Sequence, residues 1–465
     1  MRFSINNLGA IETAEIDLSK RLTLFCGPNN TGKTYLSYIT YALITMPKFP
    51  LGVDIQNPIG TEQIERLFNN EHIEIKIDPQ HVMQYKEYMT STVAEHLDSI
   101  FGISEESKKL LFKDFAIKFI PTLEECASKI ASITFSAMLN INEFSFLVEK
   151  TQPLSVIVSL KGASSYSENP MAPIINLVLY SGILNLFSTF PITEAAIFPV
   201  ERMSIYTFKN ELSINRNILI DQVQRLVSKN KIDPFEFIQQ RSNRYPLAIS
   251  KGLEVANDLV EIQKQNGEYY QLANEIEHQL LNGNILADDN GDVQFISEKT
   301  IKSRKLPIHM TASIVKSLSS LIFHLKYLAR KDSLIIIDEP EMNLHPDSQI
   351  ILVHILGKLI NAGIRLLVST HSDYIIRELN NLIMAAEIND GEYIKNTVGY
   401  PSDILISHHD VGAYFFKYRT KKKVSVSSLM VNEYGISISS IDSVIKEQNE
   451  KTDRLFFKLK YPEDE

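Results

Sequence analysis

Leu22-Thr-Leu-Phe-Cys-Gly-Pro-Asn-Asn-Thr-Gly-Lys-Thr34 is the stretch that decides the fold of this chain. Its apolar start, Leu22 to Phe25, predicts a buried strand, and apolar residues recur at helical spacing over 36–43. Gly27-x-x-x-x-Gly32-Lys33-Thr34 therefore lies between a strand and a helix, which is the setting of a phosphate-binding loop. A glycine turn that matches this pattern by chance is the alternative, and the flanking strand and helix argue against it.

The loop carries the groups that bind a nucleoside triphosphate. Its glycines let backbone N–H groups turn towards phosphate oxygens, and the following helix adds its positive dipole. Lys33 can reach the β- and γ-phosphates, and the Thr34 hydroxyl can ligate Mg²⁺. We therefore expect ATP and Mg²⁺ as cofactors, and a binding loop made of Gly27, Pro28, Asn29, Asn30, Thr31, Gly32, Lys33 and Thr34.

A second strong signal is Ser333-Leu-Ile-Ile-Ile-Asp-Glu-Pro-Glu341. Its consecutive apolar residues predict a strand buried on both faces, as in a parallel sheet. That strand ends in Asp338 and Glu339, at the edge where α/β sheets bind ligands. Asp338 is placed to hold Mg²⁺, and Glu339 to orient the attacking water or accept its proton. A strand that ends in two solvated acids is the alternative, and the upstream loop argues against it.

One β-α-β unit later, residues 364–370 predict another buried strand, and His371 follows directly. A histidine at this strand end can hydrogen-bond the γ-phosphate and report its presence. A strand-end histidine on its own is more often structural, but its place after the acidic pair favours the functional interpretation. We therefore expect Lys33, Glu339 and His371 to be the catalytic residues.

A helix is predicted to begin near Met310, with Thr311 or Ser313 as its cap and free N–H groups facing an anion. An ordinary capped core helix is an equal alternative. The spacing of the motifs is informative, because Lys33 and Asp338 lie 305 residues apart (338 − 33), whereas Ser313 lies only 25 residues before Asp338 (338 − 313).

Bulk properties limit the class of protein. A chain of 465 residues is too long for one compact core, and a net charge of −9 argues against a surface that coats nucleic acid, although a local basic groove stays possible. Two cysteines fit a reducing, cytoplasmic compartment. The N-terminus lacks the apolar segment of a signal peptide. Residues 171–192 are uncharged but interrupted by proline, glycine and polar residues, so we expect a buried helix there, with a membrane span as a remote alternative.

The expected organisation is an α/β nucleotide-binding core with helical insertions. Residues 1–78 and 284–420 form this core, to which strands at 144–160 and 195–202 contribute. Residues 79–143 are expected to be a helical insertion and 203–283 a helical arm or lid. A hairpin and tail over 413–465 complete the chain.

In motif order and spacing the chain resembles ABC-type ATPases of the SMC/RecF/OLD group, within the AAA family. Gly27–Thr34 is similar to their Walker A motif, and Ile335–Glu339 to their Walker B motif. Asn343–Pro346 falls at the D-loop, and His371 at the switch histidine. The resemblance covers about residues 1–60 and 290–415, and implies a P-loop domain with a mixed sheet.

The signature motif departs from the family. Thr311-Ala-Ser-Ile-Val-Lys-Ser317 stands in place of Leu-Ser-Gly-Gly-Gln, so Ser313 matches the signature serine while the glycine pair is missing. The resemblance implies a homodimer or higher homo-oligomer with ATP at the interface, where Ser313 of one subunit binds the nucleotide of the other. No Q-loop glutamine is assigned.

Two further strings, Glu-Pro-Glu-x-x-Leu-His-Pro (339–346) and Val-Glu-Arg (200–202), are similar to the ATPase subunits of anti-phage systems such as Septu, PARIS and retron-associated systems. Only 94 residues follow His371 (465 − 371), without the Asp-x-Asp pair of an OLD-type TOPRIM nuclease. The leading hypothesis is therefore a sensor ATPase of an anti-phage complex that controls a separate effector, a nuclease.

Two alternatives accompany this hypothesis, and one further string contains residue types that bind metals. A RecF-like DNA-repair or chromosome-maintenance ATPase would act directly on DNA, and the cluster Arg419-Thr-Lys-Lys-Lys423 could touch nucleic acid, although a solvated turn is the simpler interpretation. The motor of an ABC transporter is disfavoured by the large helical inserts, and we expect no membrane partner. His408-His409-Asp410 could be drawn as a metal site, but consecutive residues of a strand point to opposite faces, so we interpret it as structural.

Overall fold

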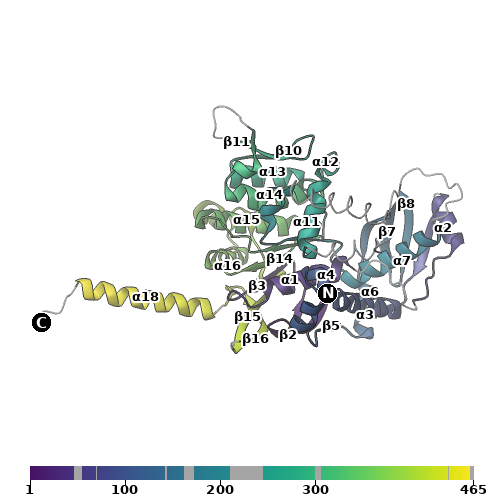
Figure 1. Ribbon diagram of the computed structural model, residues 1–465, viewed down its shortest axis with the longest axis horizontal. Helices are drawn as coiled ribbons and strands as arrows, with labels where there is room; N and C mark the ends of the chain where they lie inside the picture. Colours follow the sequence, from purple (N-terminus) through teal and green to yellow (C-terminus); the bar gives the residue numbers. More distant parts are fainter. Residues whose placement is uncertain are drawn as a thin grey trace, which may run out of the picture.

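A nine-stranded mixed sheet runs through the molecule (Figure 1). The computed structural model describes residues 1–46, 55–69, 71–141, 144–161, 172–209, 245–298, 305–420, 422–437 and 439–460. In spatial order the strands of this sheet are β5 (Ala116–Phe119), β1 (Arg2–Leu8), β2 (Ile11–Asp17), β16 (Lys423–Leu429), β15 (Val411–Thr420), β3 (Leu22–Cys26), β14 (Arg365–Thr370), β13 (Leu334–Asp338) and β9 (Ala195–Phe198).

One half of the sheet is parallel and buried on both faces. Strands β15, β3, β14, β13 and β9 pair in parallel, and every residue of β3, β13 and β14 is buried. Alternate side chains point to opposite faces, so Ile336 and Leu367 join one hydrophobic cluster while Ile337 and Val368 join the other. The predicted α/β fold class is confirmed, with the mixed sheet of a P-loop domain.

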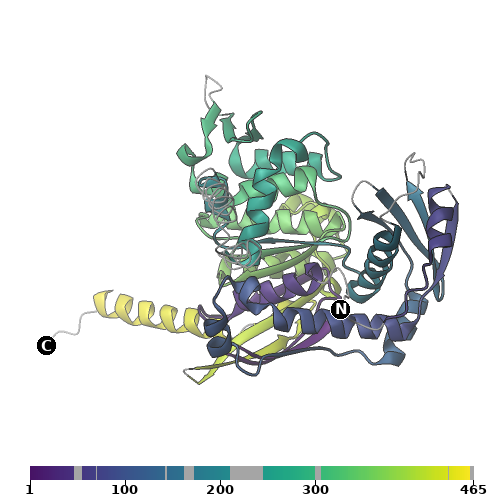
Figure 2. The same ribbon diagram turned by 45° about the vertical axis from the view of Figure 1, so that its right-hand side comes forward.

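Helices cover both faces of this parallel half (Figures 1 and 2). Helix α1 (Lys33–Thr45) contributes its apolar residues to one hydrophobic cluster. The apolar residues of α14 (Ser313–Tyr327), α15 (Pro346–Asn361) and α16 (Asp373–Glu387) belong to the other. The segments that follow the C-terminal ends of β3, β13 and β14 therefore lie between two helical layers.

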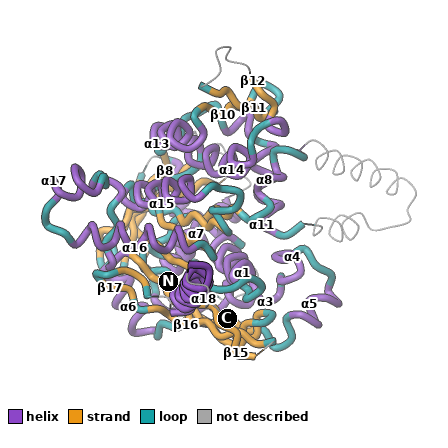
Figure 3. Tube along the Cα trace, turned by 90° about the vertical axis from the view of Figure 1, so that its left-hand side faces the viewer, coloured by secondary structure: helices purple, strands orange, loops and turns teal. Residues whose placement is uncertain are grey.

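The hairpin predicted within 413–465 is present, and its two strands are internal to the main sheet. Strand β15 pairs with β16 in an antiparallel hairpin, but β15 also pairs in parallel with β3, and β16 with β2. Buried Phe416 and Val424 anchor the hairpin in the core. Beyond the short pair β17 (Val431–Asn432) and β18 (Gly435–Ile436), helix α18 (Ser439–Lys460) projects away from the body; Figure 3 looks along it.

A second lobe carries its own four-stranded sheet, at the right of Figure 1. The strands at 144–160 were predicted to join the nucleotide-binding core, but they pair with β4 and β6 in this separate sheet. Short strand-like runs such as these predict strands but do not reveal which strands they pair with. In spatial order the strands are β4 (His72–Lys76), β8 (Ser155–Lys161), β7 (Phe144–Gln152) and β6 (Phe135–Ile141).

Residues 79–143, predicted as a helical insertion, hold two strands as well as helices. Strand β5 pairs with the edge strand β1 of the main sheet, and β6 belongs to the second lobe. Local caps explain where two of the helices start. Asp78 is the N-cap of α3 and accepts a hydrogen bond from the backbone N–H of Gln80, and Thr122 and Glu125 form a capping box at the start of α6. The helices from this part of the chain are α2 (Thr61–Phe68), α3 (Pro79–Glu95), α4 (Leu97–Phe101), α5 (Glu105–Leu111), α6 (Leu123–Ser132) and α7 (Ala172–Thr189), of which α4 lies beside α1 of the main body.

The described part of the region predicted as a helical arm at 203–283 is made mainly of short helices joined by turns, and residues 210–244 lie outside the described residues. Its elements are α8 (Arg202–Ile205), α11 (Leu247–Asn257), α12 (Leu259–Ile262), α13 (Tyr270–Ile276) and the π-helix η1 (Glu277–Leu281). A three-stranded sheet follows, made of β10 (Gly283–Ala287), β11 (Val293–Ser297) and β12 (Lys305–Pro307). The remaining short helices are η2 (Ile308–Met310), α17 (Gly391–Tyr393), η3 (Ile394–Val398), η4 (Ser402–Ile404) and η5 (His408–Asp410). The division into functional domains stays a prediction.

Residues 172–189 of the uncharged segment form α7, which packs inside the second lobe through Leu179, Ile183 and Leu184. None of the helices in the described ranges has both the length and the hydropathy of a membrane span.

Candidate functional site

The loop between β3 and α1 has a backbone that only particular residues can adopt. Gly27 has φ +142°, and a Cβ added there would lie 2.5 Å from the backbone oxygen of Phe416. Gly32 and Asn30 have φ values of 93° and 61°, in the left-handed region that favours glycine and asparagine. On the neighbouring strand, the Tyr418 hydroxyl donates to the Asn30 carbonyl at 2.9 Å and to the Asn29 carbonyl at 3.3 Å. The loop is therefore held open by its glycines and fixed from β15.

Lys33 begins α1 and folds back over this loop. Its Nζ donates to the backbone oxygens of Gly27 and Pro28, each at 2.9 Å, and the Thr31 hydroxyl donates to the Pro28 oxygen at 2.8 Å. Burial lowers the pKa of the Lys33 ammonium below its ordinary value, while the negative charges of Glu339 and Asp338 act in the opposite direction. The Lys33 ammonium is thus held beside a loop whose backbone amides can bind an anion such as phosphate.

Thr34 and Asp338 meet although they lie 304 residues apart. The Thr34 hydroxyl donates to Oδ2 of Asp338 at 2.6 Å, and the Ser369 hydroxyl hydrogen-bonds Oδ1 of the same carboxylate. Asp338 is completely buried, so these two hydroxyls replace the water that would otherwise solvate it. The predicted metal-ligating pair is therefore brought together by β13 and the first turn of α1.

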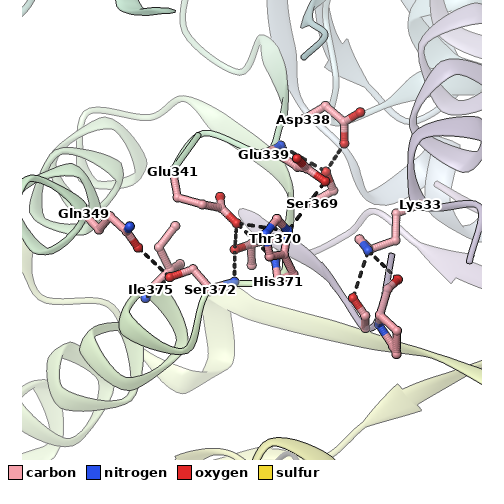
Figure 4. A network of polar contacts seen from close by, with 12 residues as sticks. Lys33, Asp338, Glu339, Glu341, Gln349, Ser369, Thr370, His371, Ser372 and Ile375 are labelled. Atoms are coloured by element: carbon pink, nitrogen blue, oxygen red, sulfur yellow. Dashed lines mark hydrogen bonds and ion pairs between the residues drawn. The ribbon is translucent and has the colours of Figure 1, made fainter. Parts of the chain in front are cut away.

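Glu339, Glu341 and His371 form the next cluster along the same sheet edge (Figure 4). Glu339 has a left-handed φ of 47°, and its Oε1 lies 3.5 Å from Nδ1 of His371. Oε1 of buried Glu341 accepts the Thr370 hydroxyl at 2.6 Å and the backbone N–H of His371 at 3.1 Å. Since the side chains of Glu339 and His371 are 24% and 45% exposed, both can reach a ligand that Glu341 cannot.

Two groups at this edge were not assigned a role from sequence. Glu341 orients the end of β14, and its Oε2 is buried without a hydrogen-bond partner among the described residues. Arg202, which follows β9, donates to the backbone oxygens of Asp338 and Glu339 at 2.7 and 3.0 Å. Both lie in the strings 339–346 and 200–202, so a signal was present, but it indicated a resemblance rather than a function.

The start of α14 differs from its prediction. Neither Thr311 nor Ser313 caps the helix, because Ala312 is the N-cap residue and makes no side-chain hydrogen bond. The Thr311 hydroxyl instead donates to the Ile308 carbonyl at 2.7 Å, which closes the preceding 3-10 turn. Ser313 is exposed at the first position of α14 and makes no contact with the phosphate-binding loop of its own chain that is recorded among the described residues. Its role at the nucleotide of a second subunit stays a prediction.

The other sequence candidates are a histidine string and a basic hairpin tip. His408-His409-Asp410 forms the 3-10 helix η5, where Nδ1 of His408 lies 2.6 Å from a Glu387 oxygen. No group of three or more histidine, cysteine or acidic residues that could hold a metal ion occurs within the described ranges. At the hairpin tip, Arg419 and Lys423 both pair with Glu12, at 3.5 and 2.6 Å.

Comparison with known proteins gives a family. A family model described as "AAA ATPase domain" matches residues 1–376, which include every motif from the Gly27 loop to His371. No curated protein matches the chain.

Three solved Smc head domains share a low similarity. One from Pyrococcus furiosus, with an extended coiled coil and bound to the C-terminal domain of ScpA, is 12% identical with a TM-score of 0.34, and covers 96% of this chain and 98% of that chain. An SmcHead bound to the C-winged helix domain of ScpA is 11% identical with a TM-score of 0.35 over 93% and 98%. The SMC head domain from Thermotoga maritima is 10% identical with a TM-score of 0.29 over 92% and 98%. Structural similarity at these TM-scores assigns no role to this chain. The family model matches residues 1–376, and the chain belongs to the AAA ATPase domain family.

Proposed function

We propose that this chain binds ATP with Mg²⁺ and hydrolyses it at the edge formed by β3, β13 and β14. The observation that carries the proposal is the contact of 2.6 Å between the Thr34 hydroxyl and the Asp338 carboxylate. It joins the start of α1 to the end of β13 and brings the loop cation Lys33 into the same site. A glycine turn that matched by chance would have no reason to meet a buried aspartate.

The residues at this contact suit Mg²⁺. A hydroxyl and a carboxylate are hard oxygen donors, which this ion prefers. Thr34 and Asp338 would hold it, while Ser369 orients the Asp338 carboxylate from behind. When bound, Mg²⁺ neutralises part of the phosphate charge that develops during transfer.

The remaining residues of the site divide the chemistry between them. Lys33 exchanges its two loop carbonyls for the β- and γ-phosphates, and the glycine loop directs backbone amides at them. Glu339 accepts a proton from the attacking water or orients it, and its carboxylate is exposed enough to reach that water. His371, 3.5 Å from Glu339, hydrogen-bonds the γ-phosphate and so links its presence to the position of the base.

We propose that the complete site needs a second copy of the chain. Ser313 lies exposed at the first position of α14, and no side chain caps that helix, so its first amides are open to an anion. In a head-to-head pair, this serine would complete the nucleotide site of the partner, and ATP binding would favour a homodimer or a higher homo-oligomer. Hydrolysis would then release the pair.

For the biological role, we propose an anti-phage sensor ATPase in the cytoplasm whose nucleotide cycle controls a separate effector nuclease. This finer proposal is supported by the sequence strings around Glu339 and Arg202. Direct DNA binding of the RecF-like kind is the competing proposal. It draws no support from the hairpin tip, where two of the basic side chains already pair with Glu12.

A binding experiment tests the ATP site, and experiments with DNA and with the infected host separate the two biological roles. Lys33→Ala should weaken binding of a fluorescent ATP analogue by at least about 100-fold, because a charge-assisted phosphate contact and its neighbours are lost together. Unchanged affinity would refute the ATP site.

ATP hydrolysis by the purified chain should also be insensitive to added DNA at low and high salt. Stimulation by DNA that fades between about 50 and 200 mM salt would favour the RecF-like role. Cleavage of DNA by the chain alone would refute a separate effector. The defence proposal expects the chain isolated from its phage-infected host to carry a distinct nucleic-acid-cleaving protein whose activity depends on Lys33.

A further inference from the structure

Arg202 is a buried cation whose hydrogen-bonding capacity is completely used. Its side chain is 2% exposed, and its Nε and two terminal nitrogens make five hydrogen bonds of 2.7 to 3.1 Å. A guanidinium has five N–H donors, so none is left over. Every acceptor is neutral, which means that geometry rather than a direct ion pair holds the side chain in place.

These acceptors belong to three elements that the chain brings together from far apart. Arg202 donates to the backbone oxygens of Asp338 and Glu339, at the end of the Walker B strand β13. It also donates to the backbone oxygen and the hydroxyl of Ser317 in α14, each at 3.1 Å. The fifth bond, to the Pro199 oxygen, closes the turn from β9 into α8. One side chain therefore joins the catalytic strand end to the signature helix.

The position of each acceptor matters for the proposed reaction. Ser317 lies four residues after Ser313, about 6 Å along the helix axis, so it belongs to the first turns of α14. Glu339 has the left-handed φ of 47°, and its carbonyl is directed at Arg202 while its carboxylate faces His371. A change in the backbone at Glu339 would therefore be transmitted through Arg202 to α14, the helix proposed to face the second copy.

The surrounding charges favour an arginine here. Burial lowers the pKa of the Arg202 guanidinium to about 10, and four acidic side chains oppose that effect: Asp338, Glu341, Glu339 and Glu201. A lysine would keep the charge, but its three donors cannot reach five acceptors in three directions. Met203, the residue after Arg202, also contacts the segment that follows β13, because its Sδ lies 3.2 Å from Nδ2 of Asn343 in the D-loop.

We propose that Arg202 is a positioning residue that couples the nucleotide state of the Walker B strand end to the N-terminal turns of α14. It contacts no substrate, and acts by making the backbone of Asp338 and Glu339 move as one unit with Ser317. The proposal rests on the proposed function in one respect, since it requires a nucleotide beside Glu339.

The test is hydrogen exchange of the full chain, measured by mass spectrometry with and without the non-hydrolysable analogue AMP-PNP and Mg²⁺. Two regions are read separately, the loop with α1 (residues 27–45) and α14 (residues 313–327). In the wild type, the analogue should slow exchange in both regions. In Arg202→Lys, the effect on residues 27–45 should stay within about twofold of wild type, while the effect on residues 313–327 should fall by at least fivefold.

Arg365→Lys is the matched control. Arg365 is also a buried arginine that donates to backbone oxygens, those of Ser19 and Lys20 at 3.2 Å, but it lies at the opposite end of β14. In Arg365→Lys, AMP-PNP should slow hydrogen exchange in both regions as much as it does in the wild type. If Arg202→Lys does not fold, Ser317→Ala decides, because it removes only the hydroxyl acceptor and should reduce the α14 response about twofold.

The outcomes are distinct. A wild-type α14 response in Arg202→Lys, or in Ser317→Ala when the first variant is unfolded, overturns the proposal. An equal loss of the α14 response in Arg365→Lys overturns it as well, because any buried arginine would then suffice. If AMP-PNP leaves residues 27–45 of the wild type unprotected, the proposed ATP site itself fails, and this is seen before any variant is compared.

Discussion

Thr34→Val tests the metal-binding half of the site without changing its shape. Valine and threonine are both β-branched and of similar size, so the first turn of α1 should be kept. The substitution removes one hydroxyl, the group that lies 2.6 Å from Oδ2 of Asp338. A methyl group of valine occupies the place of that hydroxyl, so the buried Asp338 carboxylate loses a hydrogen-bond donor that water does not replace.

The size of the effect follows from this contact. A hydrogen bond or ligand bond to a charged group contributes about 1.5–3 kcal/mol, which corresponds to about 10- to 150-fold in affinity. Thr34→Val should therefore weaken ATP binding by about that factor when Mg²⁺ is present. With EDTA in place of Mg²⁺, the variant and the wild type should agree within about threefold, because Lys33 and the loop amides are unchanged.

The assay is a Mg²⁺ titration of fluorescent ATP analogue binding, with Thr34→Ser as the control that restores the hydroxyl. Thr34→Ser should stay within about threefold of wild type at every Mg²⁺ concentration. Equal losses for Thr34→Val in EDTA and in Mg²⁺ would refute the reasoning, since the hydroxyl would then act on the loop rather than on the ion. An unchanged Mg²⁺ dependence would refute it as well.

Three further predictions concern the scaffold. Gly27→Ala should introduce about 1–3 kcal/mol of strain and weaken ATP binding, because its Cβ would lie 2.5 Å from a backbone oxygen; Gly391→Ala, where an added Cβ meets no described atom within 4 Å, should bind ATP like the wild type. Lys326→Met leaves Glu277 buried without its partner at 2.7 Å, and should destabilise the fold by about 3–5 kcal/mol in chemical unfolding, whereas adding Glu277→Leu should recover most of that loss. His324→Phe should make the fold less sensitive to acid between about pH 6.5 and 4.

The pH prediction has a definite sign. Burial lowers the pKa of His324 to about 4, and its Nε2 has no hydrogen-bond partner among the described residues. Between that pKa and the ordinary value of 6.5, the unfolded chain binds the extra proton and the folded chain does not. The wild type should therefore lose stability as the pH falls through this window, by up to about 3 kcal/mol. Equal acid sensitivity of wild type and His324→Phe in unfolding experiments would contradict this cause.

Local motifs explain why much of the site was predictable. The glycine loop, the apolar run of β13 and the strand before His371 each carry their own pattern within about ten residues. Parallel strands end at one edge, so their terminal residues were expected to meet, and the contact between Thr34 and Asp338 joins them. The class of fold follows from the same patterns.

The features that the sequence did not predict depend on contacts between distant segments of the chain. The hairpin of β15 and β16 was predicted as a hairpin, but its insertion between β3 and β2 is decided by burial of Phe416 and Val424 in a core assembled from the whole chain. The acceptors of Arg202 on Ser317 and Asp338 lie 115 and 136 residues away, so no periodicity around Arg202 reveals them. The cap of α14 failed as a prediction because Ala312 occupies the N-cap position, between the two candidate residues, and the Thr311 hydroxyl donates backwards to the Ile308 carbonyl.

The most direct measurement of the central claim is a comparison of ATP binding, ATP turnover and molecular mass in wild type and Glu339→Gln. Glutamine keeps the shape of Glu339 but cannot accept the proton of the attacking water. The variant should bind ATP with Mg²⁺ within about threefold of wild type, lose at least about 100-fold in turnover, and accumulate as an ATP-dependent dimer or larger assembly. Undiminished hydrolysis by Glu339→Gln would contradict the account, because the carboxylate at the end of β13 would then play no part in the reaction.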